Sequence, residues 1–133
     1  MIPNIHPANR TDGYPLSAVG QAGFHMTDTS CPISAQTWGA AYASAQTAIH
    51  AADLVLAGEA ATYALCRPPG HHAFAELAGG FCYLNNSGIA AQRLRDLGRN
   101  VWLFDFAPKG ERSAEGQNAV NAMLGARQPL EDM

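Results

Sequence analysis

Charge is scarce in this sequence of 133 residues. Only 14% of the residues are charged, whereas about a quarter is usual for soluble domains. Lys109 is the only lysine. Nucleic-acid binding needs clustered lysine and arginine to displace counterions, so we exclude a nucleic-acid partner. A surface with so little charge indicates that part of it is covered by a partner or by further chain, and we expect a homodimer or a higher homo-oligomer.

Long apolar runs and paired cysteines are also missing. No apolar run reaches the roughly 18 residues of a membrane span, so we expect no membrane partner. The first four residues resemble neither the basic nor the apolar part of a secretion signal. The three cysteines, Cys31, Cys66 and Cys82, form no Cys-x-x-Cys pair. This usage indicates free thiols in a reducing compartment, and we predict a cytoplasmic protein.

The length fits one compact domain over residues 1–133. Residues 1–33 contain proline and glycine too often for a long element, and we expect an irregular leader there. The regular pattern of a core occupies 34–106, and the tail over 107–133 has a different character.

A helix over 35–57 is the clearest element of the sequence. Ser34 is a suitable N-cap and Gly58 a suitable stop. Apolar side chains recur there at steps of three and four, which places them on one face. The members of this face are Trp38, Ala41, Ala45, Ala48, Ala52 and Val55. Because the face is rich in alanine, a neighbouring element can approach closely.

Two short apolar runs flank a second predicted helix. The runs at 61–66 and 101–106 are typical of buried strands, and the helix between them covers 84–97. Asn85 or Asn86 is expected in the first turn of that helix. Strand, helix and strand in this order predict an α/β fold with a parallel sheet and a right-handed βαβ core.

Two further expectations concern the core and the tail. Trp38 and Trp102 are large apolar side chains that we expect in the core and not in a binding platform. A weak helix is predicted over 113–125, although Gly116 lowers the helix propensity there.

The run Arg-Pro-Pro-Gly-His-His-Ala at 67–73 follows the first predicted strand directly. In open α/β sheets, ligands bind beyond the carboxyl ends of the strands. Two prolines stiffen the run, and Gly70 permits a backbone conformation that is closed to other residues. The imidazoles of His71 and His72 are suited to general acid or base work near neutral pH. The alternative is that these rings only hydrogen-bond neighbouring loops.

A second run, Gly-Gly-Phe-Cys-Tyr-Leu-Asn-Asn at 79–86, gives the sequence a family resemblance. Together with 67–73 it resembles the histone deacetylase superfamily, and 23–33 is similar to the acetylpolyamine deacetylase (acetylpolyamine amidohydrolase) branch. The resemblance covers about 20–106 and indicates a partial, truncated member. It implies a three-layer arginase/deacetylase fold and hydrolysis of an acetyl-amide of acetylated polyamines or acetyl-lysine by a zinc-activated water.

The resemblance also implies roles for particular residues. His71 and His72 match the tandem active-site histidines, of which one acts as general base and the other orients and charges the site. Asp105 matches the aspartate that supports one of these histidines. Gly80 and Phe81 match substrate-binding positions, with Phe81 as an aromatic wall of the channel. The substrate implied is a small acetylated amine.

The family's metal motif, Asp-x-Asp-x-His-His-Gly, is altered in this sequence. The positions of two zinc ligands are held by Ala107 and Lys109. Alanine has no donor atom, and a protonated lysine repels a metal cation. We therefore assign no metal ligand and expect an incomplete zinc site. Loss of the metal lowers the family reaction to near background.

Three hypotheses follow from this departure. In the first, the chain is a deacetylase whose metal ligands come from unusual positions or from a second subunit. Candidate ligands within the chain are His6, His25, Asp28 and Asp105. In the second, the chain is a metal-free hydrolase or esterase that uses the histidine pair. Its conceivable nucleophiles are Ser30, Cys82 and Ser87. In the third, the chain is a non-catalytic, self-associating binding or structural unit.

Overall fold

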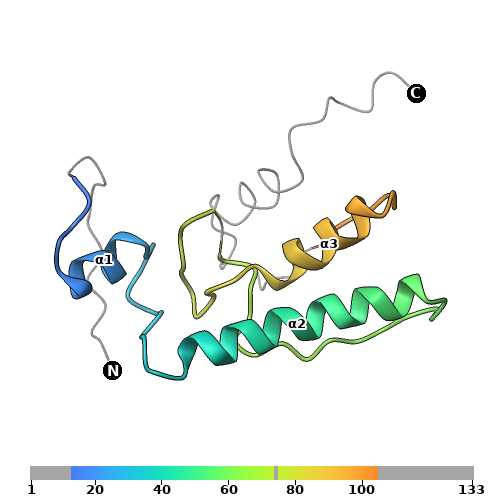
Figure 1. Ribbon diagram of the computed structural model, residues 1–133, viewed down its shortest axis with the longest axis horizontal. Coiled ribbons are helices and arrows are strands. Elements are labelled where there is room, and N and C mark those ends of the chain that lie inside the picture. Colours follow the sequence, from blue (N-terminus) through green and yellow to red (C-terminus); the bar gives the residue numbers. More distant parts are fainter. Residues whose placement is uncertain (1–12, 74, 105–133) are drawn as a thin grey trace, which may run out of the picture.

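The computed structural model describes residues 13–73 and 75–104, and within them it contains three helices (Figure 1). These are α1 (Ala18–Phe24), α2 (Thr37–Leu56) and α3 (Asn86–Asp96). Helices α2 and α3 confirm the two helices predicted over the core. No helix in the described part of the chain is long and apolar enough to cross a membrane.

The two ends of α2 test the predicted N-cap, Ser34, and the predicted helix stop, Gly58. The helix begins after Gln36, whose side chain makes no capping bond. The predicted cap Ser34 instead donates its backbone N–H to Oγ1 of Thr37, over 2.9 Å. At the other end, Gly58 has a φ of 114° just beyond Leu56, as a helix stop requires. The predicted stop is confirmed, and the predicted cap lies two residues too early.

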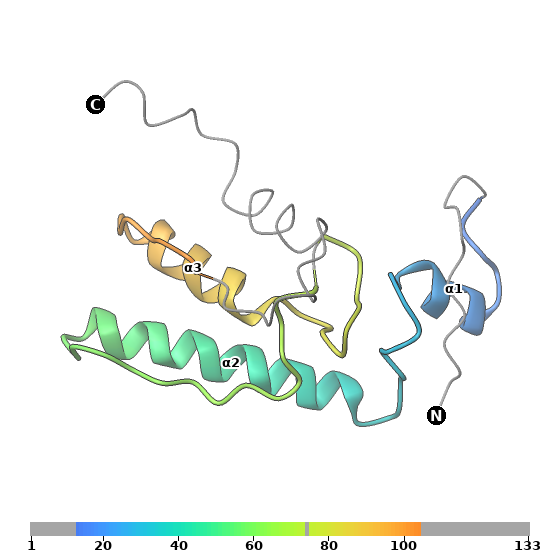
Figure 2. The same cartoon turned by 180° about the vertical axis from the view of Figure 1, so that it is seen from behind.

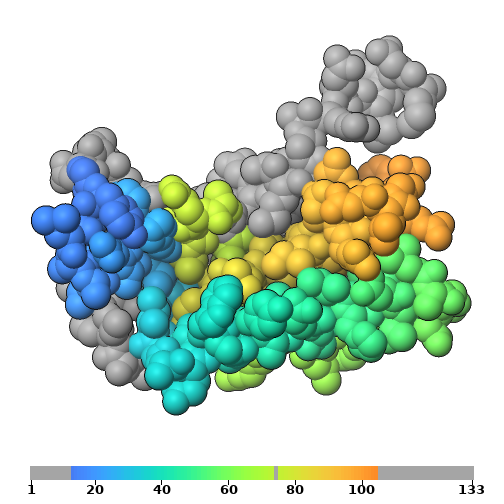
Figure 3. All heavy atoms as spheres, in the orientation of Figure 1, coloured from blue at the N-terminus to red at the C-terminus, as the bar shows by residue number. Residues whose placement is uncertain are grey.

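Helices α2 and α3 lie side by side and run in the same direction (Figures 1 and 2). The amide of Asn86 donates to Ser44 Oγ over 3.0 Å, and Arg93 pairs with Asp53 over 2.9 Å. Small side chains fill the seam. The buried residues of α2 are Ala41, Ser44, Ala45, Ala48 and Ala52. The alanine face is therefore a packing surface, and Figure 3 shows the atoms of the two helices in contact along the seam.

An extended segment over 61–66 returns along α2 in the opposite direction (Figure 2). Thr62 Oγ1 donates to the carbonyl of Ala51 over 3.1 Å, and Cys66 Sγ donates to that of Ser44 over 3.4 Å. No described residue belongs to a strand ladder. The order of extended segment, α3 and second extended segment is as predicted, but the parallel sheet stays a prediction. A strand is stabilised by hydrogen bonds to a neighbouring strand. In the described part of the chain, no strand pairs with 61–66 or with 101–104.

Large apolar side chains alternate along both extended segments. Tyr63 is 87% exposed, Leu65 78%, Trp102 73% and Phe104 73%, whereas the residues between them are half-buried. This two-residue period is that of a strand with one covered face. Trp38, on α2, is 67% exposed. The prediction that the two tryptophans lie in the core is wrong, because most of the surface of each side chain is exposed to solvent.

Helix α1 was missed because we expected an irregular leader over residues 1–33. It has only seven residues, and Ser17 caps it by accepting a hydrogen bond from Gly20 N–H over 3.1 Å. The segment after it docks onto a loop far along the chain. The backbone of Ala78 exchanges hydrogen bonds of 2.8 Å with His25 and Thr27. The leader is thereby attached to the loop that precedes α3.

Candidate functional site

The histidine turn, residues 67–73, connects the first extended segment to the loop before α3. The rings of His71 and His72 meet edge to face, with centroids 4.3 Å apart and planes at 84°. Both side chains are half-buried, and the backbone N–H of Ala73 donates to the carbonyl of Gly70 over 3.1 Å. The turn therefore presents two adjacent imidazoles with different orientations.

Close packing explains the glycine of this turn. A Cβ atom on Gly70 would lie 2.7 Å from the carbonyl oxygen of Leu84 and would collide with the backbone N of Asn86. The φ of Gly70 lies outside the left-handed region. We predicted that this glycine supplies an unusual backbone conformation, and that reason is wrong. Its role is to let the turn touch the backbone at the start of α3.

The substrate-wall candidates occupy a tight turn of their own. Gly79 and Cys82 exchange backbone hydrogen bonds of 3.1 and 2.8 Å. Between them, Gly80 and Phe81 have φ values of 50° and 64°, as the two central residues of a type I′ turn do. For phenylalanine this conformation costs on the order of 1 kcal/mol. The side chain of Phe81 is 61% exposed, so the strained residue faces solvent.

The two turns meet where His72 lies against Gly80. A Cβ on Gly80 would collide with the ring of His72, so only glycine permits this contact. Asp28 fixes the position of Gly80, because its Oδ2 accepts from Gly80 N–H over 2.8 Å and its Oδ1 accepts from Ser30 N–H over 2.6 Å. The structure thus brings His72 next to the predicted wall residues. The predicted carboxylate Asp105 lies outside the described residues.

Two buried thiols lie near the meeting point of the turns. Cys31 and Cys82 are fully buried, and all three cysteines are free, as predicted. Burial, and secondarily the charge of Asp28, raises the pKa of Cys31 to about 11. Burial also raises the pKa of Cys82. Neither sulfur is a thiolate at neutral pH, and this argues against Cys82 as a nucleophile.

The metal-ligand candidates that the structure describes have other partners. The ring of His25 bonds the carbonyl of Glu76 through Nδ1 over 2.9 Å and the hydroxyl of Tyr14 through Nε2 over 3.1 Å. Both carboxylate oxygens of Asp28 accept backbone hydrogen bonds. No group of three His, Cys, Asp or Glu side chains suited to a metal occurs among the described residues.

The remaining candidates, His6 and Asp105, lie outside the described part, as do Ala107 and Lys109. The chemistry of the donors at the last two positions is fixed by the sequence: one has no donor atom and the other carries a positive charge. A catalytic zinc needs three protein ligands. The residues present do not fit the family's zinc site.

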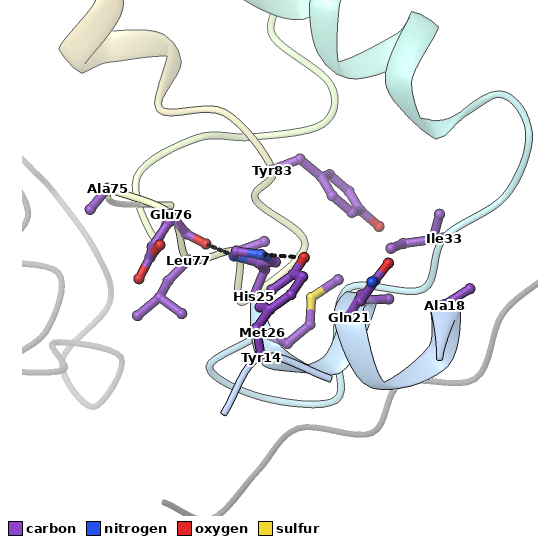
Figure 4. A pocket seen from close by; sticks show the side chains of 12 residues that line it. Tyr14, Ala18, Gln21, His25, Met26, Ile33, Ala75, Glu76, Leu77 and Tyr83 are labelled. Atoms are coloured by element: carbon purple, nitrogen blue, oxygen red, sulfur yellow. Dashed lines mark hydrogen bonds between the residues drawn. The ribbon is translucent and has the colours of Figure 1, made fainter. Parts of the chain in front are cut away.

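A pocket of about 500 Å³ lies between α1 and the loop over 75–78. Figure 4 shows His25 in its wall, bonded on one side to Tyr14 and on the other to Glu76. Tyr83 also lines it, and its hydroxyl donates to the carbonyl of Pro32 over 2.6 Å. Neither imidazole of the histidine turn lines this pocket. It is a feature of the docked leader.

Comparison with known proteins defines the class of this chain. The family model described as histone deacetylase domain matches residues 5–107. This match covers both turns and α1 to α3. The chain belongs to the histone deacetylase family.

Its relatives include acetylpolyamine amidohydrolases of bacteria. It is 56% identical over 87 residues to that of Burkholderia pseudomallei (strain 1710b), covering 65% of this chain and 26% of the relative. It is 46% identical over 98 residues to acetylpolyamine amidohydrolase 1 of Pseudomonas aeruginosa, covering 72% and 28%. A crystal structure of the acetylpolyamine aminohydrolase from Burkholderia pseudomallei matches with a TM-score of 0.58 and 53% identity, over 69% of this chain and 26% of that one. The described helices correspond to part of an arginase/deacetylase fold, and the chain spans about a quarter of the length of these relatives.

Sequence reasoning missed the residues that hold the two turns together. Asp28 was considered only as a metal ligand, although it holds Gly80 in place. Ser44, in the middle of the alanine face, was not singled out, yet its hydroxyl donates to the carbonyl of Pro68 over 2.7 Å. A polar side chain on an otherwise apolar helix face was the one available signal for this contact.

Proposed function

We propose that this chain carries the proton-transfer part of a hydrolase site for small acetylated amines. The observation that carries the proposal is the perpendicular pair formed by His71 and His72, 4.3 Å apart on a turn packed against Gly80, with Phe81 exposed beside it. Relatives named acetylpolyamine amidohydrolases support the substrate class.

In the proposed reaction, water attacks the acetyl carbon and the carbon–nitrogen bond breaks, giving acetate and a free amine. One imidazole accepts the proton of the water and passes a proton to the leaving nitrogen. Asp105 holds the tautomer of one of the two imidazoles and stabilises its charged form, and the other imidazole helps to orient and charge the site. The exposed ring of Phe81 provides an apolar wall for the methylene chain of the amine.

Zinc, where a family site holds it, activates the attacking water. Because Ala107 and Lys109 do not fit that site, we expect the chain by itself to hydrolyse acetyl-amides at a rate close to background. Contact between a substrate and the histidine pair can be measured without turnover, so binding is the first quantity to measure.

The test follows the histidine ring signals of the labelled full chain by NMR while a mono-acetylated diamine is added. We expect the signals of His71 and His72 to shift and those of His50, an exposed histidine of α2, to stay in place. Unchanged signals of the pair at millimolar ligand, together with no amine release in the presence of zinc, contradict the proposal. Elemental analysis of the same sample separates the hypotheses further. Stoichiometric zinc means that other residues supply the ligands.

The metal-free alternative receives less support. Cys82 is fully buried with a raised pKa, and the hydroxyl of Ser87 donates to Asn85 Oδ1 over 3.2 Å. Hydrolysis of an activated ester that survives a chelator and disappears in His71→Ala would favour this alternative.

Self-association is the second candidate function, and the outer faces of the extended segments favour it. Tyr63, Leu65 and Trp102 are each more than 70% exposed, an arrangement that leaves an apolar surface uncovered. We propose that a second copy of the chain covers this surface. Sedimentation at micromolar concentration is expected to give a dimer or larger species, and a monomer would contradict the proposal.

A further inference from the structure

The paired asparagines at the start of α3 contact both ends of the histidine turn. Asn86 Nδ2 donates to the carbonyl of Pro68 over 3.1 Å, before the histidines. Asn85 Nδ2 donates to the carbonyl of Ala73 over 2.8 Å, directly after them. Each amide therefore binds one end of the short segment that carries the two imidazoles.

We propose that Asn85 and Asn86 are positioning residues that set the relative orientation of the His71 and His72 rings. The inference rests on the proposed function for its catalytic meaning. Its structural content, which is the geometry of the ring pair, can be tested without activity.

The two amides are themselves held in place. Asn85 is the N-cap of α3, since its Oδ1 accepts from Gly88 N–H over 2.8 Å, and Asn86 is the first residue of the helix. Both side chains are 5% exposed, so their hydrogen bonds act in a low dielectric. Because α3 packs on α2 through small side chains, the amides form part of a rigid two-helix unit.

Helix α2 supplies a third contact to the same turn. The hydroxyl of Ser44 donates to the carbonyl of Pro68 over 2.7 Å and accepts from Asn86 Nδ2 over 3.0 Å. The first end of the turn is thus bonded to both helices. Gly70 lies directly on the backbone at the start of α3, which leaves the segment no space to move inward.

An unsatisfied atom argues that these amides serve more than stability. Asn86 Oδ1 is buried and has no hydrogen-bond partner among the residues that the structure describes. A buried acceptor without a partner is unfavourable, and the first helical position needs no amide side chain. The two donated hydrogen bonds of Asn86 therefore account for an asparagine here. Residues that sacrifice stability in this way occur most often at functional sites.

The test compares histidine ring signals in three full-chain variants. Asn85→Ser keeps a capping oxygen for Gly88 and removes the donor to Ala73. Asn86→Ser removes the donor to Pro68. Ala90→Gly, in the middle of α3, lowers helix stability and removes no hydrogen bond to the turn, so it is the stability-matched control.

We expect the ring 15N and 1H signals of His71 and His72 to shift by more than their linewidths in both asparagine variants. In Ala90→Gly they should remain at the positions of the parent chain, and His50 should be unchanged throughout. Unchanged pair signals in the folded asparagine variants, or equal shifts in Ala90→Gly, would overturn the inference.

A further variant and a separate readout cover the cases in which an asparagine variant does not fold or the proposed function fails. If an asparagine variant does not fold, Ser44→Ala removes a bond to the same carbonyl from the other helix and must produce a shift at the pair. If the chain fails to bind or hydrolyse acetylated amines, the proposed function fails, but the ring signals still decide the positioning role.

Discussion

The histidine turn and the outer faces of the extended segments are built in opposite ways. Around the turn, Ser44, Asn85 and Asn86 satisfy its carbonyls, and Gly70 admits close contact with the backbone of the next element. On the outer faces, Leu65 and other large apolar side chains meet solvent. The polar groups of the histidine turn find their partners within the described chain, whereas the apolar outer faces need another surface to cover them.

The largest test of this contrast is Gly70→Ala. The new Cβ would meet the carbonyl of Leu84 at 2.7 Å, and neither backbone can rotate away as a side chain could. We expect a loss of about 3 kcal/mol in the free energy of unfolding, at the upper end of the usual effect of overpacking. Urea denaturation followed by circular dichroism measures it.

Gly39→Ala is the matched control for that variant. Nothing lies within 4 Å of a Cβ built on Gly39, which is inside α2. Here alanine should stabilise the chain by up to about 1 kcal/mol through helix propensity. If Gly70→Ala is as stable as the parent chain, the turn is not closely packed and the contrast fails.

The buried thiol of Cys31, near the histidine turn, should have a smaller effect on the free energy of unfolding, and alkaline pH should reveal it. An exposed thiol has a pKa of 9.0, and burial raises that of Cys31 to about 11. As pH rises through this window, the unfolded state releases its proton first, so the stabilisation present below pH 9 is lost towards pH 11. We expect the urea midpoint to fall over this range and to fall less steeply in Cys31→Ala. Equal slopes for the two proteins would count against the burial of this sulfur.

The smallest change in stability is expected from substitutions on the outer faces of the extended segments. Trp102 is 73% exposed and Leu65 78%, so truncating either to alanine removes little buried area. At concentrations too low for association, we expect the free energy of unfolding to change by no more than about 0.5 kcal/mol. The same variants should weaken any dimer seen by sedimentation. A loss above 2 kcal/mol in the monomer would mean that these side chains are covered after all.

The helices were predictable because their signals are local. The three- and four-residue spacing of Ala41, Ala45 and Ala48 identified α2 and its packing face, and Gly58 marked its end. The start of α3 at Asn85 and Asn86 was also predicted. Helix α1 escaped notice because a helix of seven residues that contains two glycines shows little periodicity.

The residues of the candidate site were predictable from the sequence, whereas most of the residues that hold them in place were not. The sequence singled out His71, His72, Gly80 and Phe81, and the structure places His72 against Gly80. Asp28 and Ser44 could not be assigned their partners, which lie 52 and 24 residues away along the chain. Such contacts depend on how the loops fold back, which no local pattern records.

The sequence by itself determined the family, helices α2 and α3, and the chemical groups of the histidine turn, because each of these depends on residues that are close together in the chain. Only the tertiary structure decided that Gly70 serves close packing, that two tryptophans remain exposed, and that the asparagines of α3 bind the turn from both ends. These outcomes depend on which distant atoms meet, because burial and hydrogen bonding are properties of the contacts between segments.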